Sequence, residues 1–71
     1  MNFSEYRAKA LNVLWPRVKE ECGHSDRWVI NRPEFSTWEI DDICAMNWKY
    51  NNPLSSCVDG LMSYIKEILG G

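Results

Sequence analysis

A long apolar run, a basic surplus and an even set of cysteines are all missing from this sequence of 71 residues. No apolar stretch approaches the ~20 residues that a membrane-spanning helix needs, and the first residues lack the basic and apolar regions of a signal peptide. The cysteines Cys22, Cys44 and Cys57 are odd in number and widely spaced, unlike a disulfide framework. We therefore expect a soluble, cytoplasmic protein with free thiols and no membrane partner.

The charge balance argues against nucleic acid as a partner. The chain carries 8 basic and 10 acidic residues, a net charge of −2. Nucleic-acid binders usually have a basic surplus, because neutralising phosphates supplies much of their affinity. The charge is also uneven, since residues 1–33 carry a net +2 and residues 34–71 a net −4.

What the chain does have is apolar and aromatic residues. They make up 45% of the sequence and include four tryptophans, which is enough for a core without a metal or a disulfide. A length of 71 residues corresponds to one domain, residues 1–71. Such a chain has little material left for a deep catalytic cleft, so we do not expect an enzyme.

Apolar spacing predicts three main helices, roughly 3–22, 37–48 and 53–69. The last has the most regular stripe, with apolar residues at Leu54, Cys57, Val58, Leu61, Met62, Ile65, Ile68 and Leu69. In the first, Pro16 lacks an N–H group, so either the helix kinks there or a second short helix begins there. Gly23 is expected to end it.

Capping patterns predict where the later helices begin. Ser36 and Glu39 have the spacing of a capping box, and Phe35 and Ile40 that of a hydrophobic staple. At the last helix, the pattern predicts that Asn52 caps and that Pro53 is the first helical residue.

Residues 24–35 are expected to be irregular, and their apolar run Trp28-Val29-Ile30 to pack across the core, or to form a short extended piece. The predicted fold is all-α, a compact three- to four-helix bundle. Helices 37–48 and 53–69 could form a helix-turn-helix arrangement within it.

Cys22, His24, Cys44 and Cys57 have the ligand count of a structural zinc site. Only Cys22 and His24 are close in sequence, and Cys44 and Cys57 fall inside apolar stripes, where cysteine behaves as a small hydrophobic residue. We therefore expect no cofactor, while convergence of the four residues stays open. Cys22 and His24 could also form a nucleophilic pair, but no third orienting group can be placed.

Four residues are predicted to bind a protein partner because of their type and position. Arg27, Trp28 and Arg32 lie in the irregular segment, where functional residues tend to occur. Trp38 lies off the apolar stripe of its helix. Tryptophan and arginine are enriched in binding hot spots, which supports all four.

Asp41, Asp42 and Gly60 complete the predicted protein-binding set. The two aspartates belong to an acidic run with Glu34 and Glu39, without a compensating base nearby in sequence. That run could present negative charge to a basic partner, or serve only to complement the helix dipole. Gly60 lies in a strip of small residues on the expected outer side of the last helix, where a backbone could approach closely.

The functional hypothesis is a small protein-binding regulator or inhibitor that docks on a larger protein or complex, with a homodimer as a further possibility. Phages and mobile elements often carry chains of this size class to block host machinery. The alternative is a helix-turn-helix DNA-binding transcription regulator, whose phosphate contacts would have to come from Arg17, Lys19, Arg27 and Arg32, since the outward residues of the last helix include no arginine or lysine.

Overall fold

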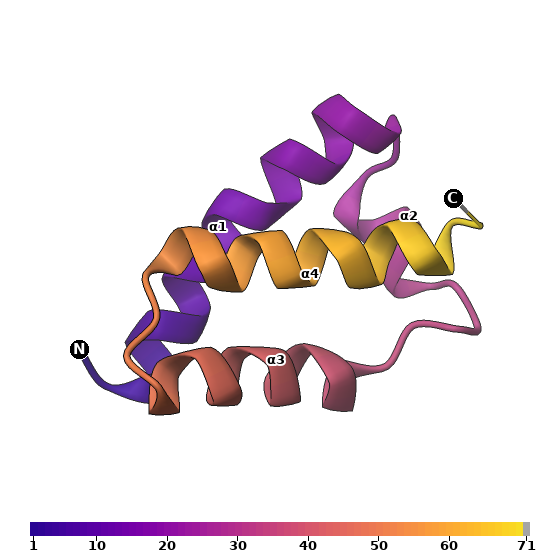
Figure 1. Ribbon diagram of the computed structural model, residues 1–71. Helices are drawn as coiled ribbons and strands as arrows, with labels where there is room; N and C mark the ends of the chain where they lie inside the picture. The colour runs from indigo at the N-terminus through magenta and orange to yellow at the C-terminus, as the bar shows by residue number, and fades with distance from the viewer. Residues whose placement is uncertain (71) are drawn as a thin grey trace.

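The protein is an all-α bundle, as predicted. The computed structural model describes residues 1–70, and within them it contains no strand and four helices: α1 (Phe3–Cys22), α2 (Asp26–Ile30), α3 (Thr37–Lys49) and α4 (Leu54–Ile68). Figure 1 shows α3 and α4 side by side and running in opposite directions. Helix α1 packs against both of them.

Helix α1 continues through Pro16 as one element, so the alternative of a second helix beginning there is wrong. The Asn2 side chain accepts a hydrogen bond from the backbone N–H of Glu5 at 2.8 Å, which caps the first turn as predicted. Gly23 ends the helix with φ +76°, in the left-handed region that glycine adopts without steric cost.

The segment 24–35 is not wholly irregular, because α2 lies inside it. Ser25 caps this short helix by accepting a hydrogen bond from the N–H of Trp28 at 3.2 Å. The alternative prediction of a short extended piece at Trp28-Val29-Ile30 is therefore wrong. Only Val29 is buried, while Trp28 and Ile30 remain exposed. A five-residue helix has too few turns to show apolar periodicity, which explains why the sequence did not reveal it.

Helix α3 begins where predicted but is held differently. The Ser36 side chain makes no capping hydrogen bond. Instead, the Ser36 backbone N–H donates to the hydroxyl of Tyr64 on α4, at 2.8 Å. The hydrogen bonds predicted for the capping box are therefore wrong. The acceptor for the Ser36 N–H is the hydroxyl of Tyr64, 28 positions away. Phe35 and Ile40, the predicted staple, both pack in the core cluster.

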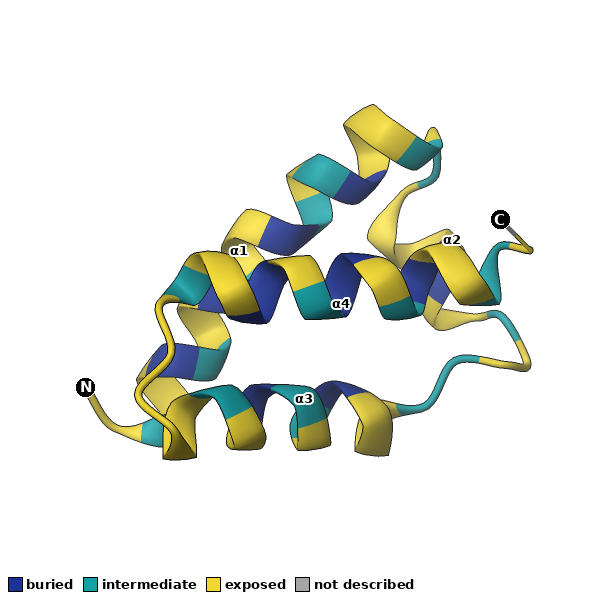
Figure 2. Cartoon of the chain, viewed as in Figure 1, coloured by how far each residue is buried: buried dark blue, intermediate teal, exposed yellow. Residues whose placement is uncertain are grey.

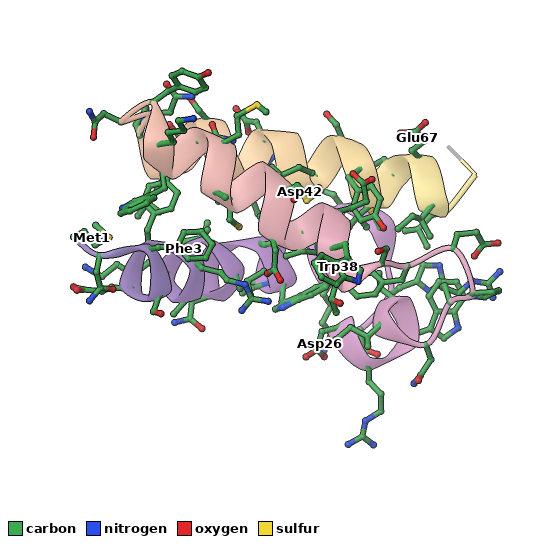
Figure 3. The ribbon with its side chains drawn as sticks, turned by 90° about the horizontal axis from the view of Figure 1, so that it is seen from below. Met1, Phe3, Asp26, Trp38, Asp42 and Glu67 are labelled. Atoms are coloured by element: carbon green, nitrogen blue, oxygen red, sulfur yellow. The ribbon has the colours of Figure 1, made fainter. Side chains whose placement is uncertain are left out.

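Residues 50–53 form the turn between α3 and α4, and Figures 1 and 3 show that these two helices run in opposite directions as a helical hairpin. Asn51 has φ +56°, a conformation that asparagine tolerates. Pro53 is the N-cap and α4 begins at Leu54, so the predicted start was one residue early and Asn52 does not cap it.

The core lies where α1, α3 and α4 meet. Its fully buried side chains come from all four helices, with Leu14, Val29, Ile40 and Leu61 among the largest. The predicted stripe on α4 is confirmed, and Figure 2 shows the exposed side of α3 turned away from α4. The hydroxyl of Tyr6 donates to the carbonyl of Asn52 at 2.9 Å and so joins α1 to the hairpin turn.

Candidate functional site

Three of the predicted binding residues come together in one groove, which we call the α2 groove. It has a volume of about 390 Å³ and is lined by Ser25, Arg27, Trp28, Asn31 and Arg32. These residues converge because one short helix and its two ends carry them all.

The aromatic ring of Trp28 organises the α2 groove. The His24 ring stacks on it, with the ring centroids 3.7 Å apart and the planes within 7° of each other. The guanidinium carbon of Arg32 lies 4.9 Å from the centroid of the Trp28 ring, a cation–π contact. Trp28 is nevertheless 40% exposed, so the cluster remains accessible to a ligand.

Trp38 lies outside the α2 groove and directly follows Thr37, which lines a small apolar crevice between α1, α2 and α3. The apolar crevice has a volume of about 140 Å³ and is lined by Arg7, Leu11, Trp15, Ile30, Phe35, Thr37 and Ile40. Figure 3 shows the Trp38 side chain at the start of α3, on the side where α2 lies. Trp38 is 77% exposed and Ile30 is 46% exposed. Together with the crevice they form what we call the Trp38 face.

The acidic run has more basic partners than its sequence context suggested. Arg7 on α1 pairs with Asp41 at 2.6 Å, and Arg32 lies 3.8 Å from Glu34. The prediction that the run lacks a compensating base is therefore wrong for Asp41 and Glu34. Asp42 and Glu39 form no ion pair within residues 1–70 and are exposed.

Sequence reasoning missed an acidic pocket at the end of the hairpin. The pocket has a volume of about 510 Å³ and is lined by Glu34, Ser36, Glu39, Tyr64, Glu67 and Ile68. Glu34 and Glu39 belong to the acidic run that the sequence showed, whereas Glu67 reaches the pocket from α4, 33 positions after Glu34.

Gly60 does not lie on the open surface, which corrects its expected position. It is half-buried, and a Cβ atom added there would lie 3.3 Å from Cγ2 of Ile43 on α3. The close approach that Gly60 permits is therefore between two helices of the same chain. Trp48 is 40% exposed, and its ring meets that of Phe3 edge-on.

The four candidate metal ligands do not converge. Cys44 and Cys57 face each other with their sulfur atoms 3.7 Å apart, whereas Cys22 and His24 line a separate surface depression. Within the described part of the chain, no three histidine, cysteine, aspartate or glutamate side chains are grouped to hold a metal ion.

Of the four cations that a DNA-binding surface would need, Arg17 is engaged in two ion pairs. Arg17 bonds to Glu21 at 2.9 Å and to Asp59 on α4 at 3.1 Å. Hydrogen bonds from Arg17 and from Lys66 hold the pKa of Glu21 below its ordinary value.

In residues 1–70, no helix combines the length and apolar character needed to cross a membrane.

Comparisons with protein-family models, with curated proteins and with solved structures find no match to this chain. The residues themselves therefore carry the functional argument.

Proposed function

We propose that the protein is a small binding module that regulates or inhibits a larger protein by docking on it through the Trp38 face. The observation that carries this proposal is the 77% exposure of Trp38, whose sequence neighbour Thr37 lines an apolar crevice. An exposed tryptophan next to an apolar hollow is a common feature of binding surfaces, because tryptophan is enriched among the residues that dominate binding energy.

The surroundings of the crevice support the same function. Its walls come from three helices, with Leu11 and Trp15 from α1, Ile30 from α2 and Ile40 from α3. The Arg7–Asp41 ion pair joins α1 to α3 at this face. A partner would therefore meet an apolar centre with a polar rim, which is the usual anatomy of a protein interface.

The connection between α1 and α3 also supports a binding role. Residues 25–40, which comprise most of this connection and the first turn of α3, contribute to the α2 groove, the apolar crevice and the acidic pocket. Segments that connect the elements of a rigid scaffold often carry binding residues.

Site-specific photo-crosslinking tests the proposal. Benzoylphenylalanine replaces Trp38 in one variant and Tyr50 in a control, because Tyr50 is also exposed, at 66%, but lies outside the Trp38 face. After irradiation in the native host, we expect position 38 to give one dominant adduct with a larger protein that position 50 does not give.

Identical adducts from both positions, or none from position 38, would overturn the proposal. An adduct with a second copy of the chain would replace the larger partner by a homodimer.

A further inference from the structure

The α2 groove is lined by two cations and no acidic side chain. The acidic residues closest to the arginines in sequence are Asp26 and Glu34. The Glu34 carboxylate lies 3.8 Å from Nε of Arg32, which is too far for a hydrogen bond. The groove therefore has a positive charge that its own chain compensates only weakly.

Both arginines retain unused binding capacity. Arg27 is exposed and has no ion-pair partner within residues 1–70. The Nε atom of Arg32 is buried and donates no hydrogen bond. A buried donor without an acceptor costs about 1–3 kcal/mol, so an added acceptor oxygen that reached this group would relieve that cost.

The groove is also held in shape before any ligand arrives. Trp28 is fixed by its stack on His24 and by the cap from Ser25, and Arg32 rests on the Trp28 ring. The Asn31 side chain bonds to the carbonyl of Arg27 at 2.9 Å, which holds the end of α2. Prior ordering reduces the entropy that binding would otherwise cost.

We propose that the α2 groove binds a short acidic segment of a protein, with carboxylates paired to Arg27 and Arg32. The planar fork of a guanidinium group matches a carboxylate with two parallel hydrogen bonds. Two arginines in about 390 Å³ suit one or two carboxylates. A longer polyanion such as nucleic acid would meet the net charge of −4 on residues 34–71.

This groove shares no lining residue with the apolar crevice. The inference therefore goes beyond docking through the Trp38 face, and either proposal can fail without the other.

Nuclear magnetic resonance titration of the isotope-labelled protein tests the inference, with N-acetylated, amidated tetraglutamate as the probe. We expect saturable shifts at the Trp28 indole N–H and at the Nε–H groups of Arg27 and Arg32, and no such shifts with tetralysine. Arg27→Gln and Arg32→Gln should each weaken binding about threefold, as expected for exposed ion pairs. Lys49→Gln, at an exposed cation on another part of the surface, should leave the affinity unchanged.

The backbone amide spectrum of each variant shows whether it is folded. Shifts that are absent, that spread evenly over the surface, or that survive both arginine substitutions would overturn the inference. Tighter binding of tetrathymidylate than of tetraglutamate would overturn it as well, because the groove would then favour phosphate over carboxylate.

Discussion

At the scale of single residues, Cys44 and Cys57 are the most unusual titratable groups. Both are fully buried between α3 and α4, with their sulfur atoms 3.7 Å apart. Burial, together with the nearby Cys57, raises the pKa of the Cys44 thiol to about 12. Burial also raises the pKa of Cys57 and of Tyr6. The folded core therefore favours the neutral form of all three groups.

These shifts predict that the protein loses stability in alkali. The ordinary pKa of a thiol is 9.0, so the unfolded chain releases these protons at a lower pH than the folded chain. The stabilisation is complete below about pH 9 and is lost as the pH rises toward about 12. We expect the free energy of unfolding, measured with urea, to fall by about 1 kcal/mol or more between pH 8 and pH 10.

Two variants separate this effect from other alkaline changes. Cys44→Ala should flatten the pH dependence, whereas Cys22→Ala, outside the buried pair, should leave it as steep as in the parent. An equally steep fall in the Cys44→Ala variant would contradict the assignment to the buried thiols.

Gly60 gives a second prediction at this scale. Alanine there would gain about 1 kcal/mol of helix propensity, but its Cβ would lie 3.3 Å from Cγ2 of Ile43. Because the branched carbon of Ile43 is stiff, we expect Gly60→Ala to stabilise the protein by clearly less than that amount.

The Ile43→Leu substitution removes Cγ2. In that background, Gly60→Ala should stabilise the protein by more than it does in the parent. Urea unfolding of the four proteins in this double-mutant cycle measures the coupling. A coupling free energy of zero would show that the contact does not matter.

At the scale of helices, the starts of α1 and α3 are stabilised by different means. Asn2 caps α1 through its own side chain. The start of α3 depends on α4, because the Tyr64 hydroxyl accepts the hydrogen bond from Ser36 and also lies 3.4 Å from the carbonyl of Glu34. Local sequence therefore determines the first boundary, and tertiary packing contributes to the second.

The two helix starts should respond differently to alanine. We expect Asn2→Ala to cost about 1 kcal/mol, as for other capping residues. Ser36→Ala should cost only a few tenths of a kcal/mol, because the Ser36 side chain makes no capping bond. Thermal and urea unfolding of both variants measures the difference, and equal costs would mean that Ser36 caps α3 in solution.

The predictable part of the fold is the part that depends on periodicity. The stripe from Leu54 to Leu69 is long enough to define α4, and Gly23 marks the end of α1. The capping bonds at Ser36 could not be predicted, since they depend on where Tyr64 lies after folding. The course of α1 through Pro16 was open for a similar reason: packing of its apolar face outweighs the lost hydrogen bond.

At the scale of the whole molecule, charge and apolar surface gather along the connection between α1 and α3. The α2 groove is basic, the Trp38 face is apolar and the acidic pocket carries three glutamates. Arg32 and Glu34 lie only two positions apart, yet they line depressions of opposite charge. A partner that contacts all three surfaces would therefore bind in one preferred orientation, because its charged groups must face surfaces of opposite charge.

The sequence predicted part of this surface. Arg27, Trp28 and Arg32 were predicted from their residue types and their place in the segment 24–35, and the structure places them in one groove. Glu67 was not foreseen, because it reaches the acidic pocket from α4. Sites within one segment can be inferred from the sequence, whereas sites assembled from distant helices depend on the fold.

The most direct test of the account is the affinity of the purified partner for two variants, measured by isothermal titration calorimetry. If the Trp38 face is the docking surface, Trp38→Ala should weaken binding by at least about tenfold, or about 1.4 kcal/mol. Tyr50→Ala, which removes another exposed ring, should change it less than about twofold. Equal affinities for the parent and the Trp38→Ala variant would contradict the account.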